Sequence, residues 1–523
     1  MKKLVVITVI SSAVLFLSAS VNAQQRTKKG EEAPKTEAQL LLEKADSADA
    51  PLVITLDQAL QIALSENVSV KVADKEIERT QYAKKGTYAS LFPQIDISGA
   101  YQRTIKKQVM YMDFDMSSMG GGSSSGAASE LADILTRIAA LEAANGIASP
   151  TPTPPAGSGS GTSSEDASSK IANGMEVGRW NTWSAGVSAA MPIVNAQLWE
   201  SIKVSGKSVE LAVEKARASR LDMVSQVKNA YFATLLAKEA FDVYKQVYEN
   251  AVSNYEEAQK KFNAQKASEL ELARAKTTVA NAIPNVYSAE SNVILSLWQL
   301  KAVMGVDLDL NIDVDGALED YSTQMMRDIN EIDSLSLSNN TTMRQLAIQA
   351  EQLASSIRVQ KFANIPTLSL GFNFSMNAMT NDFNFSQYRW TPYSYVGLSL
   401  SIPVFAGGKR YQAIRQAKNQ YEQVQLQTTN TERQLKIAIR QSLNTMETSM
   451  KTYYSSIEAV NMAQKAYDIA EKSYQVGRST LIELNDAQLA LTQARLGQSQ
   501  AIYNFVIAKA QLENTLGHDF IEE

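Results

Sequence analysis

The chain has 523 residues and a formal net charge of −5, with 55 acidic and 50 basic residues. This acidic balance argues against a nucleic-acid partner, and the absence of cysteine excludes disulfides, thiol chemistry and a lipid-modified N-terminal cysteine. The 12 prolines and 24 glycines crowd into a few places, so the composition favours long helices over many small domains.

The first 23 residues have the pattern of a secretory signal peptide. Lys2 and Lys3 precede an apolar run from Leu4 to Leu17, and small residues precede Gln24. The run is too short for a membrane-spanning helix, and no later apolar stretch reaches the roughly 18 residues that such a helix needs. We expect an exported chain in which residues 24–51 form a flexible N-terminal segment.

Comparing the chain with itself indicates two copies of one plan. Phe262 corresponds to Tyr474 and Gly305 to Gly517, each 212 residues further on. In each copy the predicted elements follow in the order helix, strand, loop, strand and long helical hairpin. We place the first repeat at 52–305, an inter-repeat segment at 306–335, the second repeat at 336–517 and a C-terminal tail at 518–523.

Four segments alternate apolar and polar residues with a period of two, which is typical of strands. Their apolar stripes run over 95–101, 183–191, 368–374 and 396–402. Trp180, Trp183 and Trp390 lie at the loop-side ends, where aromatic residues suit a membrane interface. The pattern fits an outer-membrane barrel or an ordinary antiparallel sheet, but four strands are too few to close such a barrel, so several chains would have to share it.

The loop between the first two strands carries an insertion rich in Gly, Ser and Pro. We expect residues 105–178 to form a largely disordered, exposed extracellular segment. Its methionines, from Met110 to Met119, have no histidine or cysteine beside them, so they are weak evidence for a metal site.

Long helices and one acidic strand complete the predicted elements. A helix over 196–250 would extend about 80 Å, more than a globular core needs. From Leu484 to Leu512 an apolar seam suits coiled-coil packing. Between the repeats, 306–314 alternates apolar and mainly acidic residues and predicts a half-buried strand. A calcium loop is disfavoured because Ser322 stands where its glutamate is required.

Three segments carry a resemblance to a known family: "ITLDQALQIALSENVSV" from Ile54, "IPVFAGGKR" from Ile402 and "YQVGRSTLIELNDAQ" from Tyr474. Together with the duplicated plan they resemble the TolC-like outer-membrane efflux proteins, over residues 52–517. The resemblance implies an α+β membrane fold in which three chains each give four strands to a twelve-stranded outer-membrane β-barrel. A long periplasmic α-helical barrel continues it.

The function that the resemblance implies is passive conduction across the Gram-negative outer membrane. A periplasmic membrane-fusion adaptor and an inner-membrane pump of the RND, ABC or MFS type would deliver drugs or other small molecules. The partners are then two further copies, these two proteins and outer-membrane lipid, with no cofactor. No nucleophile–base arrangement, phosphate loop or metal-ligand cluster indicates an enzyme.

The resemblance also places the tips of the helical hairpins at the periplasmic entrance, where the adaptor docks. Tyr474 and Gly477 match the family's turn residues. The acids that line the entrance in the family match Glu271, Glu483 and Asp486. With threefold symmetry such acids form rings of like charge, which favour cations.

Two arginines are candidates for closing this entrance. The family's gate arginine falls on Ser479 of this chain, and Arg478 lies one position earlier. Arg274 takes the place of Asp486 in the first repeat, which makes it a candidate partner for Glu483 or Asp486 of a neighbouring hairpin. The alternative is that all are solvated helix charges of little individual weight.

Two other functions fit the same features. The exit duct of a type I protein secretion system uses the same kind of conduit. A trimeric coiled-coil surface adhesin or scaffold would also combine a signal peptide, long helices and no cysteine. Such a protein would not need two pairs of strands embedded symmetrically between helices.

Overall fold

The computed structural model describes residues 51–110, 134, 175–325, 336–384 and 388–518. The predicted signal peptide, nearly all of the 24–51 segment and most of the 105–178 insertion lie outside these ranges. The chain falls into two compact units, and each unit takes segments from both repeats. The first is Met1–Lys84, Val204–Ala354 and Ala417–Glu523, and the second is Lys85–Lys203 and Ser355–Gln416.

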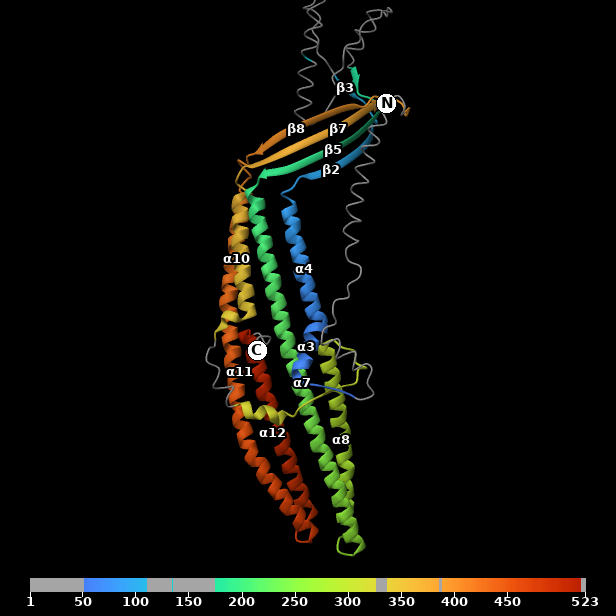
Figure 1. Cartoon of the computed structure of the whole chain (residues 1–523), viewed down its shortest axis with the longest axis vertical. Coiled ribbons are helices and arrows are strands. Elements are labelled where there is room, and N and C mark those ends of the chain that lie inside the picture. The colour runs from blue at the N-terminus through green and yellow to red at the C-terminus, as the bar shows by residue number, and fades with distance from the viewer. Residues whose placement is uncertain (1–50, 111–133, 135–174, 326–335, 385–387, 519–523) are drawn as a thin grey trace, which may run out of the picture. The chain divides into compact units, whose positions relative to one another are not determined.

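The second unit contains a four-stranded antiparallel sheet in the order β2-β5-β7-β8 (Figure 1). Its strands are β2 (Gln94–Arg103), β5 (Asn181–Val194), β7 (Thr367–Thr380) and β8 (Thr391–Ser401). Pro93 and Pro366 directly precede β2 and β7. The register between β5 and β7 shifts at Pro192, whose missing N–H cannot join the ladder.

The strand registers place the predicted apolar stripes on one face of the sheet. Ile97 lies opposite Val187, and Val187 lies opposite Phe374. Leu370 of the same β7 stripe lies opposite Leu398, which is 67% exposed. The residues that alternate with these apolar positions along each strand include serine, asparagine and glycine, and they lie on the other face. In the single chain this sheet therefore carries one apolar face open to its surroundings.

The sheet also has two open edges. Within the described residues, β2 pairs only with β5 and β8 only with β7. Unpaired N–H and C=O groups along an edge strand are a template for another strand. A short ladder of β3 (Gln108–Met110) and β4 (Met175–Val177) lies at the base of the predicted insertion.

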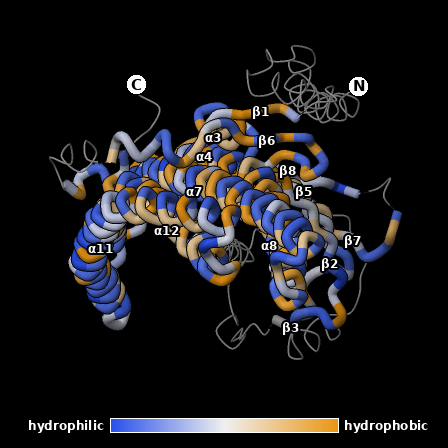
Figure 2. The backbone as a smooth tube through the Cα atoms, turned by 90° about the horizontal axis from the view of Figure 1, so that it is seen from below, coloured by the Kyte–Doolittle hydropathy of each residue, from blue (hydrophilic) through white to orange (hydrophobic). Residues whose placement is uncertain are grey.

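Two long helical hairpins dominate the first unit (Figure 1). They are α7 (Ala196–Asn263) with α8 (Glu269–Met304), and α11 (Lys409–Gln475) with α12 (Leu481–Leu516). At about 1.5 Å per residue, α7 alone runs about 100 Å. Hydrophobic and hydrophilic positions alternate along these helices (Figure 2), as expected of amphipathic helices that pack on neighbours. In the described part of the chain no helix is both long enough and apolar enough to cross a membrane.

A small layer, which we call the strap, packs against these hairpins. It consists of β1 (Leu52–Ile54), α3 (Leu56–Glu66), β6 (Ile312–Val314) and the 3-10 helix η2 (Leu318–Gln324). β1 pairs in parallel with β6, and Thr55 and Gln58 form a capping box at the start of α3. The Tyr231 hydroxyl of α7 donates to the Asp315 carbonyl at 2.6 Å, and Lys238 donates to the Val314 carbonyl at 2.9 Å.

The strand predicted over 306–314 is shorter than expected, because only Ile312–Val314 pair in a sheet. The Asp307 side chain accepts from the Asp309 N–H at 3.2 Å, and Leu310 N–H donates to the Asp307 carbonyl. The Lys301 amino group donates a hydrogen bond to the Leu308 carbonyl at 3.0 Å. These local bonds turn the chain, since an aspartate side chain competes with a strand ladder for backbone groups.

Each repeat ends in a glycine that meets an asparagine at the start of another helix. Gly305 ends α8 with a φ of 77°, and Gly517 ends α12 with a φ of 71°. Asn67, before α4 (Val68–Ala89), donates to the Val303 carbonyl at 2.6 Å and accepts from the Ser69 N–H at 2.7 Å. One side chain thus satisfies free backbone groups of two helix ends.

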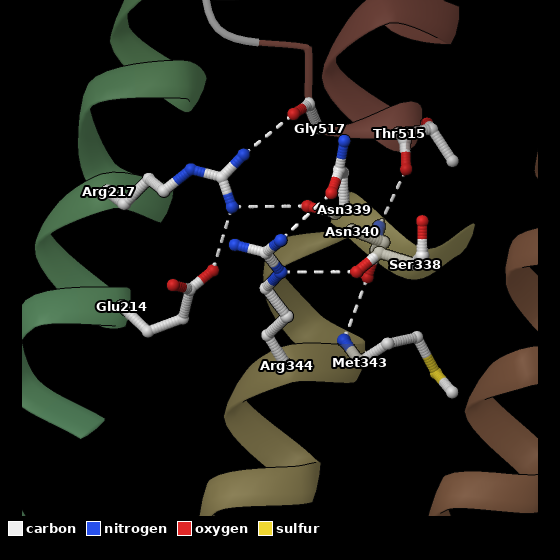
Figure 3. A network of polar contacts seen from close by, with 9 residues as sticks. All are labelled: Glu214, Arg217, Ser338, Asn339, Asn340, Met343, Arg344, Thr515 and Gly517. Carbon is white, nitrogen blue, oxygen red and sulfur yellow. Dashed lines mark hydrogen bonds and ion pairs between the residues drawn. The ribbon is translucent and has the colours of Figure 1, made fainter. Parts of the chain in front are cut away.

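The second repeat reproduces this junction (Figure 3). Asn340, before α10 (Thr341–Phe362), donates to the Thr515 carbonyl at 2.7 Å and accepts from the Met343 N–H at 2.9 Å. Arg217 of α7 adds bonds to the Gly517 carbonyl at 2.7 Å and the Asn339 carbonyl at 3.2 Å. The junction of the second repeat is therefore tied to α7 as well.

Candidate functional site

The two hairpin tips have matching turns. Gly477, between α11 and α12, has a φ of 78°, and Gln265, between α7 and α8, has a φ of 57°. The two positions are 212 residues apart, so the turn geometry is repeated although the residue is not. For a residue with a Cβ, the left-handed conformation costs about 1–2 kcal/mol. The first tip is thus the more strained of the two.

The repeated acids Glu271 and Glu483 lie at equivalent positions in the first turns of α8 and α12. The Thr480 hydroxyl accepts from the Glu483 N–H at 3.3 Å, and the Glu483 carboxylate accepts from the Thr480 N–H at 3.0 Å. Ser268 caps α8 with the first of these two bonds only, accepting from the Glu271 N–H at 3.2 Å. The motif S/T-x-x-E, present in both repeats, would have revealed this capping role from the sequence.

The Glu483 carboxylate is held in its ionised form. The Ser479 hydroxyl donates to it, and together with the Thr480 N–H this lowers the pKa of Glu483. Asp486, one turn further along, lies exposed to solvent. Of the two predicted entrance acids of the second repeat, one therefore stabilises its helix end and one faces water.

Tyr474 joins the two hairpins within one chain. Its side chain is 2% exposed, and the Lys261 amino group of α7 lies 3.8 Å from the ring centre. Lys261 also donates to the Tyr474 carbonyl. Burial raises the pKa of the Tyr474 hydroxyl, and the nearby Glu271 and Glu257 carboxylates add to this, so the group is neutral at physiological pH.

A small apolar core surrounds this contact. Its buried members are Ala258, Ala275, Tyr467, Tyr474, Leu481, Leu484 and Leu491. Asn485 of α12 donates to the Thr278 hydroxyl of α8 at 3.3 Å. The tip is thus a packed unit in which both hairpins take part. Lys261 was not expected from the sequence, because the equivalent position of the second repeat is Ser473 and no repeated pattern marks it.

The predicted arginine contacts are not made inside one chain. Arg274 and Arg478 are exposed, and in the described residues neither forms an ion pair with Glu483 or Asp486. A pairing of Arg274 with a neighbouring copy stays a prediction. The described residues also contain no cluster of three or more His, Cys, Asp or Glu side chains that could hold a metal ion.

The three predicted interface tryptophans lie at one end of the sheet. Trp180 precedes β5 and Trp390 precedes β8, and they are 37% and 41% exposed. Trp183 stacks on Tyr101 with ring centres 4.3 Å apart, and Lys107 lies 4.8 Å from the Trp180 ring centre. Amphipathic rings gathered at the end of an apolar sheet face suit the boundary between lipid and water.

A sheet with one exposed apolar face and two open edges, in a chain with long helical hairpins, is the arrangement expected of a subunit of an outer-membrane channel. The family model described as "Outer membrane efflux protein" matches residues 137–306 and 333–518. The chain belongs to this family.

Individual relatives agree with this assignment. The outer membrane protein TolC of Escherichia coli is 23% identical over 356 residues, which cover 64% of this chain and 70% of that protein. The CmeC outer membrane channel of Campylobacter jejuni superposes with a TM-score of 0.63 at 17% identity, covering 94% of this chain and 90% of that one. VceC of Vibrio cholerae gives 0.62 at 14% identity, with 89% and 96% covered.

The predicted fold class is confirmed: the chain is an α+β outer-membrane protein of two repeats, with a four-stranded sheet and long helical hairpins, in a family of outer-membrane channels. The predicted location is confirmed as well. The protein is an outer-membrane channel with its helical part in the periplasm.

Proposed function

We propose that the protein is the outer-membrane component of a tripartite efflux system. Three copies form one conduit, through which drugs or other small molecules pass passively to the exterior. A periplasmic adaptor and an inner-membrane pump supply the substrate and the energy. The chain itself performs no chemistry on its cargo.

The observation that carries this proposal is the four-stranded sheet with one apolar face and two open edges. Four strands enclose no channel, and about eight are the minimum for a membrane barrel. Pairing the β2 edge of one copy with the β8 edge of the next satisfies both edges. Three copies then give twelve strands with the apolar face toward lipid and the serine- and asparagine-rich face toward water.

The proposal is tested by reconstituting the full-length protein in planar bilayers and measuring its mass in detergent. We expect trimers that conduct ions without added energy. In cells, deletion of the gene should raise sensitivity to small toxic compounds, and the chain should be recovered with an adaptor and a pump after crosslinking. A loss of secretion of one protein, with unchanged drug sensitivity, would instead identify a type I secretion duct.

The tip is the proposed entrance gate. Glu271, Arg274, Arg478, Glu483 and Asp486 surround it, and the Lys261 contact with Tyr474 joins the two hairpins of each copy. Arg274→Glu should raise the single-channel conductance, because it replaces a candidate inter-copy ion pair by repulsion. Lys266→Glu, also in the α7–α8 tip region, is the charge-matched control. Equal conductance in Arg274→Glu and the wild type removes this pair from the gate.

A further inference from the structure

The strap identifies two opposite faces of the helices that it covers. On α7 it contacts Tyr231 and Lys238, which are seven residues apart and thus on the same side of the helix. On α12 its Tyr321 lines a small cavity together with Val506 and Lys509. These positions mark the strap side of the hairpins.

A polar groove lies between α11 and α12 on the other side. It has a volume of 350 Å³ and is lined by Asn444, Thr445, Thr448, Thr452, Gln500 and Asn504, with Gly497 leaving room at one end. Asn504 and Gln500 precede Lys509 by five and nine residues. At 3.6 residues per turn both point roughly half a turn away from the strap.

A second depression lies on the same side, over α7. It has a volume of 630 Å³, and Lys215, Asp222 and Gln226 contribute to its lining. Asp222 precedes Tyr231 by nine residues, so its side chain also points roughly half a turn away from the strap. These two depressions therefore lie on the face that the strap leaves free.

We propose that this free face lines the duct, and that the groove between α11 and α12 forms an uncharged belt of its wall. The inference rests on the proposed channel function. A duct has to keep its interior clear, and the strap occupies the opposite side of the same helices. In the assembled channel three copies of the belt would surround the passage.

The chemistry of the belt suits neutral solutes that form hydrogen bonds. Its hydroxyl and amide groups both donate and accept, and no lining residue of the groove is ionisable. In the first repeat the positions of Gln500 and Asn504 are Ser288 and Asn292, which are likewise uncharged. The belt would therefore pass cations and anions alike, while the charged groups Lys215 and Asp222 act at a different level of the wall.

The absence of native cysteine makes the lining directly testable with single cysteines. Thr448→Cys channels are treated in a planar bilayer with a positively charged methanethiosulfonate reagent, and labelling is verified by mass. Glu319→Cys, exposed on the strap, is the matched control. We expect the reagent to lower the conductance of Thr448→Cys channels and to leave Glu319→Cys channels unchanged.

A second measurement uses a permanent charge. Thr448→Asp should raise the cation-to-anion permeability ratio by about twofold or more, since three carboxylates would face the passage, whereas Glu319→Gln should leave it unchanged. The reverse pattern, or a Thr448→Cys that stays unlabelled in conducting channels, overturns the lining. If the wild-type protein forms no channel at all, the proposed function itself fails, so the two failures are distinguishable.

Discussion

At the scale of single residues, three glycines with similar backbone angles differ in what surrounds them. A Cβ on Gly517 would overlap the Asn339 carbonyl, and one on Gly305 would lie 2.9 Å from the Asn67 Cα. A Cβ on Gly477 would meet nothing within 4 Å. All three substitutions carry the strain of a left-handed backbone, about 1–2 kcal/mol, but only two also displace a neighbour.

We therefore predict a graded series of alanine variants. Gly477→Ala should cost about 1–2 kcal/mol of local stability, and Gly517→Ala about 1–3 kcal/mol more because of overpacking. Gly305→Ala should fall between them. Hydrogen exchange of the amides at the ends of α11, α8 and α12 measures the three costs separately. Equal costs would show that the asparagine junctions yield to the added methyl group.

The sequence predicted part of this picture. The sequence matched Gly305 to Gly517 as equivalent positions, and the structure shows that each of them ends a helix, as a glycine commonly does. The sequence did not predict the two asparagines that complete the junctions, since an isolated asparagine before a helix is also an ordinary cap. Lys261 was missed for a similar reason: its ring contact with Tyr474 depends on how two distant helices pack.

At the scale of elements, the start of α12 should respond to pH. The folded-state pKa of Glu483 is lowered by the Ser479 hydroxyl and the Thr480 N–H, so the carboxylate stabilises the cap in its ionised form. This stabilisation is present above the pKa of the unfolded chain and is lost as the pH falls through the lowered folded-state pKa. We predict that the first turn of α12 opens more readily in acid.

Glu483→Gln tests this prediction. The amide keeps an acceptor for the Thr480 N–H but does not titrate, so the opening of the first turn should become independent of pH in the acid range. Hydrogen exchange of the 481–485 amides, normalised to the same amides in the Gln variant, measures the difference. Glu271→Gln is the matched control. It should leave the pKa of Glu483 unchanged, so the first turn of α12 should still open more readily in acid. A wild type that opens equally at neutral and acid pH contradicts the capping role.

The long helices and the four strands followed from periodicity, because each pattern extends over many residues and one exception does not alter it. The segment 306–314 shows the limit of this reasoning. Its alternation of apolar and polar residues is regular. However, the Asp307 carboxylate accepts a hydrogen bond from the Asp309 N–H, and the Lys301 amino group donates one to the Leu308 carbonyl. Local side-chain bonds and one contact from the preceding helix outweigh a pattern of only nine residues.

At the scale of the whole molecule, the assembly depends on which face of the sheet meets lipid. Leu398 lies within the apolar face and is 67% exposed in the single chain, and the neighbouring Ser399 points to the opposite face. An arginine on the lipid side of a membrane strand costs about 2–4 kcal/mol near the middle of the bilayer, whereas one on the water side does not.

We predict that Leu398→Arg lowers the amount of heat-modifiable trimer in outer-membrane fractions, while Ser399→Arg assembles normally and reduces cation conductance. Electrophoresis before and after heating measures assembly from the amounts of trimer and monomer, and planar bilayers measure conductance. The pair is decisive because the two positions share a strand and differ only in the face they occupy. Normal assembly of Leu398→Arg, with failure of Ser399→Arg, would place lipid on the serine-rich side and invert the barrel proposed for this chain.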